Sequence, residues 1–294
     1  MKSKLSRRKF IKSTTAASIA GLFHIKCAPG FETAVFSFGL VADVHYADKT
    51  MRINRYYRES IAKLEQCVET FSHNRLPFAV HLGDFVDSAE DKQTELGYLA
   101  TIRQTFSAFK GPKHFVMGNH DLFAFSKEEY LKNCNAPTDT GYYAFDEAGF
   151  HFVVLDANFM KSGEAYDSGN YKWTDTNINP PQIEWLAQDL RNAASKKTIV
   201  FVHQNLFGED TPYGVKNAPA VREILEKAGN VLTVFQGHYH KGGHRKINGI
   251  HYLTHKALVD GASLENNSFS MVSIDRRNRV QVQGFGKQGT MVLG

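Results

Sequence analysis

The chain has 294 residues, and 42% of them are hydrophobic, which is enough for a sizeable core in one large domain or two small ones. The formal charge of +5 and the pI near 8.9 come from residues 1–28, which hold seven of the 35 Lys and Arg and no acid. The remaining residues carry 28 basic against 30 acidic side chains, a net charge of −2, so no nucleic-acid-binding face is indicated.

The N-terminal segment, residues 1–28, has the composition of a targeting signal. Ser6-Arg7-Arg8-Lys9-Phe10-Ile11-Lys12 precedes a mildly apolar run from Ala16 to Phe23. This segment resembles a twin-arginine signal, which implies recognition by the twin-arginine export machinery and export in a folded state to the periplasm or cell envelope. The alternatives are a chance Arg pair on an amphipathic helix and a transmembrane anchor; the apolar run is shorter than the ~20 residues that a span needs.

Three cysteines bear on processing and redox state. Cys27 follows the apolar run, so a lipid anchor at Cys27 is an alternative to cleavage near Ser18-Ile19-Ala20, although Lys26 departs from the small residue that normally precedes a lipidated cysteine. Cys67 and Cys134 are too few for a disulfide framework or a thiolate metal site. We expect these two to be free or buried thiols.

The first half of the chain alternates apolar runs with amphipathic segments. Ala34–Val41 is predicted to be a buried strand, and Asn54 is predicted to cap a helix that carries Tyr57, Ile61, Leu64, Val68 and Phe71. A second strand is expected within 77–82, a second helix through Leu96, Leu99, Ile102, Phe106 and Phe109, and a third strand within 114–117. This is the order of an α/β fold.

The second half continues the alternation and then becomes β-rich. Strands are predicted at 150–155, 198–202 and 231–235, with a helix opening at Pro180-Pro181 and another over 221–228. Beyond Gly243, short strands are predicted at 246–247, 250–254, 269–274 and 280–282. Asn248-Gly249 indicates a two-residue hairpin turn, so this last quarter should be mostly antiparallel.

Five polar clusters each stand just past the end of a predicted strand: Asp43-Val44-His45, Gly83-Asp84, Gly118-Asn119-His120-Asp121, His203, and Gly237-His238-Tyr239-His240. In an open α/β sheet, ligands collect at the carboxyl ends of the strands. Seven oxygen or imidazole donors, at positions 43, 45, 84, 119, 203, 238 and 240, can hold two divalent ions if one carboxylate bridges them. A pair of such ions indicates phosphate ester chemistry.

The ordered clusters resemble the motifs of the calcineurin-like metallophosphoesterases over nearly the whole of residues 34–290. The resemblance implies a four-layer α/β/β/α sandwich, in which two β-sheets are flanked by helices. It implies two ions, one held by Asp43, His45 and His240 and the other by Asn119, His203 and His238, with Asp84 as the bridge. His120 would protonate the leaving oxygen or stabilise the pentavalent phosphorus, and Asp121 would fix the His120 tautomer through Nδ1.

A narrower likeness concerns residues around and between the motifs, including Arg55-Tyr56-Tyr57-Arg58, Gly83-Asp84-Phe85-Val86-Asp87 and Lys241-Gly242-Gly243. These are similar to the manganese-dependent ADP-ribose/CDP-alcohol diphosphatases, which implies manganese; imidazole and oxygen ligation also permits iron or zinc. The chain departs from that branch at His45, where Gln is frequent, and in the shorter loop 49–54. The likeness to these diphosphatases implies that the substrates are small nucleoside diphosphate-linked compounds.

The candidate substrate contacts are cationic or polar residues near the clusters: Arg55, Asn205, Lys241, His244 and Lys256. Tyr46 and Tyr239 are expected either to stack on a base or to pack, and Trp173 and Trp185 are expected to pack. Two alternatives stay open for function. One is a phosphomonoesterase or cyclic-nucleotide phosphodiesterase with the same centre, and the other is a non-enzymatic scaffold with the same fold.

Overall fold

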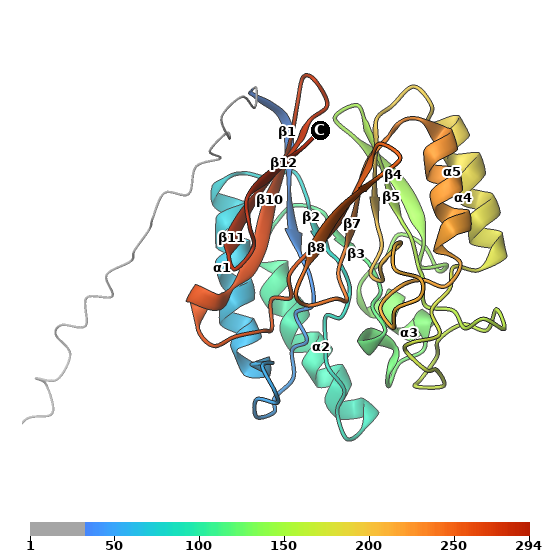
Figure 1. The fold of residues 1–294 in the computed structure, drawn as a ribbon. Coiled ribbons are helices and arrows are strands. Elements are labelled where there is room, and N and C mark those ends of the chain that lie inside the picture. The colour runs from blue at the N-terminus through green and yellow to red at the C-terminus, as the bar shows by residue number, and fades with distance from the viewer. Residues whose placement is uncertain (1–32) are drawn as a thin grey trace, which may run out of the picture.

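A computed structural model describes residues 33–294 and contains two six-stranded sheets packed face to face, with helices on both outer faces (Figure 1). The layer order is therefore α/β/β/α, as the sequence predicts. The twin-arginine segment and Cys27 lie outside the described residues. No helix within 33–294 is both long and apolar enough to cross a membrane.

The first sheet has the strand order β12-β11-β10-β1-β2-β3. Its strands are β1 (Ala34–Val41), β2 (Ala79–His81), β3 (Lys113–Phe115), β10 (Ser268–Asp275), β11 (Val280–Gly286) and β12 (Met291–Leu293). β1, β2 and β3 are neighbours and parallel, so three carboxyl ends meet at one edge, while β10, β11 and β12 are antiparallel to their neighbours.

The second sheet has the order β4-β5-β6-β7-β9-β8. Its strands are β4 (Tyr143–Glu147), β5 (Phe150–Val154), β6 (Thr198–Phe201), β7 (Val231–Gln236), β8 (Gly243–Ile247) and β9 (Ile250–Thr254). β5, β6, β7 and β9 are parallel, and β4 and β8 are antiparallel edge strands. Again, adjacent parallel strands end at the same edge.

The space between the sheets is filled mainly by phenylalanine. Phe38 of β1 packs against Phe152 and Phe201 of the second sheet, with ring centroids 5.8 Å and 5.7 Å away. Phe235 of β7 lies 6.1 Å from the same ring, and all four side chains are fully buried. Large interdigitating rings fix the two sheets against each other.

Helices cover the outer faces. α1 (Ser60–His73) and α2 (Lys92–Ser107) share a buried cluster with the first sheet, and α4 (Pro180–Asn192) and α5 (Ala218–Ala228) share one with the second. The short helix α3 is Lys127–Asn133, and the single 3₁₀ turns are η1 (Tyr57–Glu59), η2 (His120–Leu122) and η3 (Leu264–Asn266).

The predicted elements are present, with four differences. The Asn54 cap is wrong: residues 52–55 form a tight turn closed by mutual backbone hydrogen bonds between Arg52 and Arg55, and α1 begins only at Ser60. Strands β4 and β12 and helix α3 were not predicted. The hairpin turn is confirmed, because Asn248 and Gly249 both have positive φ between β8 and β9.

The remaining cysteines behave as expected. Cys67 and Cys134 are both free and buried, one in α1 and the other at the end of α3. Trp185 of α4 also packs as expected, half-buried 5.0 Å from the Tyr142 ring.

Candidate metal centre

The five polar clusters follow β1, β2, β3, β6 and β7, and they converge where the two sheets' carboxyl ends meet. Four of the candidate ligands have a backbone in the left-handed region: Asp43, His45, Asp84 and His238. That conformation is uncommon for non-glycine residues and persists only where surrounding contacts enforce it. Here the backbone N–H of Asp43 donates to the Gly83 carbonyl at 3.1 Å, and that of His45 to the Asp84 carbonyl at 2.9 Å.

The glycines that precede the ligands allow the loops to approach one another. A Cβ on Gly83 would collide with the His203 ring, and one on Gly118 would collide with the Asp84 carboxylate. Gly83 also has a φ of +94°, which side chains rarely adopt. Steric crowding therefore explains why glycine occupies these positions in the second and third clusters.

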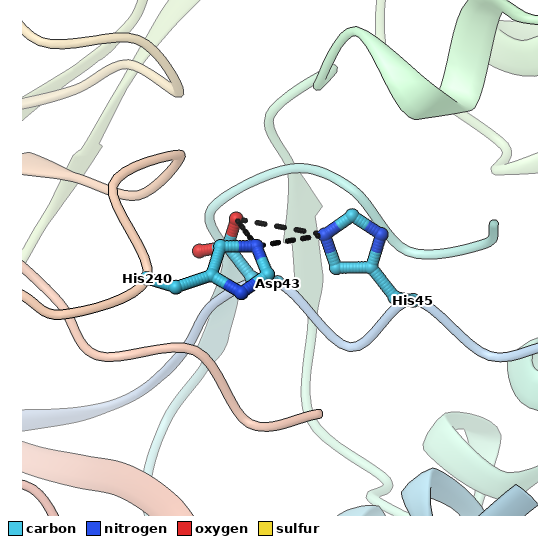
Figure 2. A group of neighbouring side chains, drawn as sticks. All are labelled: Asp43, His45 and His240. Carbon is cyan, nitrogen blue, oxygen red and sulfur yellow. Dashed lines mark hydrogen bonds and ion pairs between the residues drawn. The ribbon is translucent and has the colours of Figure 1, made fainter. Parts of the chain in front are cut away.

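The first group of candidate ligands is Asp43, His45 and His240 (Figure 2). The Nε2 atoms of His45 and His240 lie 3.2 Å apart. They lie 3.9 Å and 3.7 Å, respectively, from Oδ1 of Asp43. Three potential donor atoms thus surround one point.

Carboxylates behind the two imidazoles select the tautomer of each ring. Nδ1 of His45 lies 3.0 Å from Asp87 Oδ2, and Nδ1 of His240 lies 3.0 Å from Asp260 Oδ1. A carboxylate can only accept, so each Nδ1 carries the proton and each Nε2 presents a lone pair. Two lone pairs and a carboxylate oxygen that face one another repel, and a cation between them would remove this repulsion.

The second group is Asp84, His203 and His238, with Asn119 beside it. Nδ1 of His203 donates to the Leu82 carbonyl at 2.7 Å, so Nε2 is the ring nitrogen that faces the centre, 3.2 Å from Asp84 Oδ2. Three of the buried polar atoms that have no hydrogen-bond partner among the described residues belong to this group: His203 Nε2, His238 Nε2 and Asn119 Oδ1. Unsatisfied buried polar atoms are costly, and a divalent cation would satisfy all three.

Asp84 lies between the two groups. Its Oδ2 is 3.4 Å from His45 Nε2 and 3.2 Å from His203 Nε2, which belong to different groups. Its Oδ1 accepts the backbone N–H of His120 at 2.8 Å. This is where a bridging carboxylate would stand, and the donor set of imidazole and oxygen without thiolate fits manganese, iron or zinc.

The pKa values of the candidate ligands also indicate that a positive charge is favourable at this centre. Burial opposes the charged form of Asp84, but the His203 imidazole holds the pKa of Asp84 well below its usual range. Burial likewise opposes protonation of His203, yet Asp84 raises the pKa of His203 to about 9. Burial lowers the pKa of His45 and of His238 well below the ordinary value, which keeps both in the neutral, metal-binding form.

His120 lies beside this centre, with 28% of its side chain exposed. Its ring packs edge-on against His45 at 4.6 Å. Its Nδ1 lies 3.5 Å from Asp87 Oδ2, not near Asp121. The expected contact between Asp121 and His120 is therefore wrong, and Asp87 is the carboxylate that faces this ring.

Asp121 has a different position. Its fully buried carboxylate accepts backbone N–H groups of Asp84 at 3.0 Å, Phe85 at 2.7 Å and Gly118 at 2.9 Å. These bonds tie the second cluster to the third. Burial, aided by the nearby Asp84 charge, still raises the pKa of Asp121 to about 7.

A cavity of about 400 Å³ opens over the centre. Besides the ligand candidates, His120 and Asp87, its walls contain cationic, aromatic and small side chains: Lys49, Arg52, Ile53, Arg55, Tyr57, Ser88, Trp173 and Tyr213. This volume is in the range of small-molecule sites.

Of the five candidate substrate contacts, the structure brings only Arg55 into the cavity wall. The Asn205 side chain is buried and accepts from Thr254 at 3.1 Å. The other three do not line the cavity: Lys256 donates to the Lys287 carbonyl, His244 pairs with His251 on the β8–β9 hairpin, and Lys241 is exposed. The substrate contact of these four therefore stays a prediction, because closeness in sequence to a ligand does not by itself place a side chain in the cavity wall.

The wall residues that were not predicted as contacts include two cations and two aromatic rings: Lys49, Arg52, Trp173 and Tyr213. Lys49 and Arg52 lie in the short loop after the first cluster, whose cationic composition was a usable signal. Trp173 was predicted to pack but is 41% exposed. Tyr46 is buried against Tyr98, whereas Tyr239 lies 4.8 Å from Tyr213 just behind the wall.

In sequence, a family model described as calcineurin-like phosphoesterase matches residues 36–242. The chain is 28% identical over 271 residues to the manganese-dependent ADP-ribose/CDP-alcohol diphosphatase of Oryza sativa subsp. japonica, covering 77% of this chain and 84% of the relative. The protein of the same name from Arabidopsis thaliana is 27% identical over 299 residues, covering 82% and 95%.

In structure, the chain is similar to a dimetal phosphatase from Danio rerio, with a TM-score of 0.78 and 23% identity. The match covers 88% of this chain and 99% of that one. The common architecture is the two-sheet sandwich with helices on both outer faces.

Proposed function

The chain belongs to the calcineurin-like phosphoesterase family, and on that premise we propose that it hydrolyses the diphosphate bond of nucleoside diphosphate-linked compounds. It is a metal-dependent phosphoester hydrolase whose centre takes divalent ions. We further propose that these ions are manganese, held in two sites that share Asp84.

The observation that carries the proposal is the convergence of imidazole lone pairs on carboxylates. Asp43, His45 and His240 would hold one ion, and Asn119, His203 and His238 would hold the other. When bound, two such ions lower the pKa of water and neutralise charge on the phosphoryl group. Neutral imidazoles suit this task, because they add no negative charge against an anionic substrate.

Residues of the chain supply the rest of the chemistry. His120 faces the cavity beside the centre, and Asp87 lies next to its Nδ1, so the doubly protonated imidazolium is the form that would give a proton from Nε2 to the leaving oxygen. Asp87 also holds His45 in its metal-binding tautomer. One carboxylate thus orients a ligand and the proposed acid together.

Two features support a nucleoside diphosphate-linked substrate. Relatives over 77% and 82% of this chain are named as manganese-dependent ADP-ribose/CDP-alcohol diphosphatases. The cavity also combines cationic walls, which suit a second phosphate, with exposed aromatic rings, which suit a base.

A substrate panel tests the proposal. Protein loaded with manganese should hydrolyse ADP-ribose and CDP-choline with a higher kcat/KM than p-nitrophenyl phosphate or cyclic AMP. Asp84→Asn protein with an unchanged circular dichroism spectrum is the matched inactive control. Comparable rates on all four compounds would indicate a generalist phosphoesterase, and preference for cyclic AMP or the monoester would replace the proposal with one of those activities.

For localisation, we propose export through the twin-arginine route, supported by Ser6-Arg7-Arg8-Lys9-Phe10-Ile11-Lys12. The change Arg7→Lys with Arg8→Lys preserves charge and should leave the protein in the cytoplasmic fraction, whereas the unchanged leader should deliver it to the periplasm. Equal export of both forms would contradict the route. Mass spectrometry of the exported protein's N-terminus would distinguish simple cleavage from a lipid on Cys27.

A further inference from the structure

Two aromatic rings form one wall of the cavity. Trp173 and Tyr213 have ring centroids 5.8 Å apart and are 41% and 36% exposed. They lie 5.6 Å and 5.7 Å from the ring of His238, in the second ligand group. We call this pair the aromatic shelf. Large rings held open to solvent beside a catalytic centre are available for a planar ligand.

The loop that carries Trp173 is held against the centre. The hydroxyl of Tyr171 donates to the backbone carbonyl of Asn119, a candidate ligand. The Tyr171 ring stacks on Tyr166 at 4.0 Å, and the Trp173 carbonyl accepts from Thr176 Oγ1 at 3.0 Å. The position of the indole is therefore tied to the position of the second ion site.

The loop that carries Tyr213 is held just as closely. The backbone N–H of Asn205 donates to the Tyr213 carbonyl at 3.2 Å, and that of Val215 donates to the Asn205 carbonyl at 2.9 Å. Asn205 stands two residues after His203. Because hydrogen bonds hold the backbone at both ring-bearing residues, little ordering of the two loops is needed on binding.

Cations stand beside the other ligand group. Lys49 and Arg55 bind the Asp87 carboxylate at 2.6 Å and 3.0 Å, and Asp87 in turn binds His45 of the first group. Arg52 lines the same cavity, and its guanidinium makes no hydrogen bond or salt bridge with the described residues. The cavity is thus polarised, with an aromatic side near His238 and a cationic side near His45.

We propose that the aromatic shelf stacks on the nucleobase of the substrate, so that the other end of the diphosphate points toward Lys49, Arg52 and Arg55. This inference rests on the proposed function and adds the orientation of the substrate to it. Stacking needs only a π-face, so the shelf accepts both adenine and cytosine. Trp173 and Tyr213 are specificity residues in this assignment, while the ions and His120 act on the phosphorus.

Kinetics give the first test. Trp173→Ala should lower kcat/KM for ADP-ribose by roughly 10- to 100-fold, the range expected for losing a base–aromatic stack, mainly through KM. Trp173→Phe keeps a ring and should stay within a few-fold of the parent. Both variants should retain the parent's metal content and melting temperature. If folded, metal-loaded Trp173→Ala matches the parent in kcat/KM, the shelf assignment is overturned.

Fluorescence gives a test that does not depend on turnover. The chain has two tryptophans, and Trp185 lies in α4 against Tyr142 and does not line the cavity. In the Trp185→Phe variant, ADP should quench the emission of Trp173 saturably, whereas inorganic pyrophosphate, which has no base, should not. The Trp173→Phe variant, which keeps Trp185, is the matched control and should show no ADP-dependent quenching.

The two tests separate failure of this inference from failure of the proposed function. Hydrolysis of ADP-ribose without ADP-dependent quenching of Trp173 overturns the shelf and leaves the function standing. Quenching by ADP but not pyrophosphate, in a protein that hydrolyses no compound of the panel, supports the shelf and contradicts the function. Equal quenching by ADP and pyrophosphate also overturns the shelf.

Discussion

At the residue scale, the candidate ligands that the fold brings together were readable from the sequence because each one follows a strand inside a short motif. The partners behind the ligands were not readable. Asp87 and Asp121 both stand near ligand motifs, yet only the fold shows that Asp87 faces His45 and His120 while Asp121 faces backbone amides. Side-chain direction in irregular loops has no periodic pattern in sequence.

His120→Ala should lower kcat on ADP-ribose by roughly 10²- to 10⁴-fold, the usual value of general acid catalysis. The ring is partly exposed beside the centre, and its backbone N–H, which the change keeps, holds Asp84 Oδ1. Metal content measured by elemental analysis should therefore remain that of the parent. Full activity in the metal-loaded variant would exclude His120 from proton transfer.

Asp121→Asn should reduce stability more than it reduces metal-dependent chemistry. An amide in place of the carboxylate turns an NH₂ group toward the backbone donors of Asp84, Phe85 and Gly118. Leaving one of these buried donors unsatisfied costs about 1–3 kcal/mol in the free energy of unfolding, which urea denaturation would measure. Asp139→Asn, at an exposed position, is the neutral control. An unchanged unfolding free energy would contradict the anchoring role.

Arg52→Ala should raise KM for ADP-ribose by roughly 10-fold or more, because a hydrogen bond to a charged group is worth about 1.5–3 kcal/mol. Arg52 lines the cavity, whereas Arg58 pairs with Asp48 at an exposed position outside it. Arg58→Ala is accordingly the matched control and should leave KM unchanged. Equal effects of the two changes would mean that only overall charge matters.

At the scale of the elements, strands and helices were predicted where periodic burial decides them. β1 has the predicted bounds, Ala34–Val41, because its inward residues are continuously apolar. The start of α1 was misplaced because the turn at Arg52–Arg55 is closed by backbone bonds and by a bridge to Asp260, far away in sequence. A local cap signal at Asn54 could not report that distant contact.

One histidine, His151, makes the stability of the fold at the edge of the second sheet depend on pH. His151 of β5 binds Asp146 of β4 and Asp189 of α4, each at 2.8 Å. Burial opposes protonation of the ring, but the bonds to Asp189 and Asp146 prevail and raise the pKa of His151. The folded state therefore binds the proton more tightly than the unfolded chain, and this stabilisation is fully present below about pH 6.5 and lost as pH rises through the raised pKa.

The predicted consequence concerns the difference between parent and His151→Asn in the free energy of unfolding. That difference should be larger at pH 6 than at pH 9, as measured by urea denaturation at both values. Asp189→Asn removes one of the two carboxylates and should shrink the same pH dependence. A difference that is independent of pH would show that His151 acts through packing alone.

At the scale of the whole molecule, the order of strands and helices predicted an α/β fold, and the resemblance implied the sandwich, but neither predicted the cavity. Its walls come from the loop 49–55, the loop with Trp173 and the loop with Tyr213, which meet only after both sheets have formed. Each loop is placed by bonds to a ligand cluster, such as Tyr171 to Asn119. Loop contacts of this range depend on the completed fold and have no local signature.

The metal centre also joins the two halves of the sandwich. Asp43, Asp84 and Asn119 follow strands of the first sheet, and His203, His238 and His240 follow strands of the second. Ions held by both sets bind the folded chain and not the unfolded one, so they stabilise the fold in proportion to their occupancy.

Manganese at about 100 times its Kd should add about 2.7 kcal/mol to the free energy of unfolding. For a chain of this size, that corresponds to a rise in melting temperature of roughly 5–10 °C, reversed by EDTA. Asp84→Asn removes the carboxylate shared by both groups, and its melting temperature should respond little to manganese. Differential scanning calorimetry of the two proteins, with and without manganese, would measure these changes in melting temperature. A response of Asp84→Asn equal to that of the parent would place the stabilising ions elsewhere.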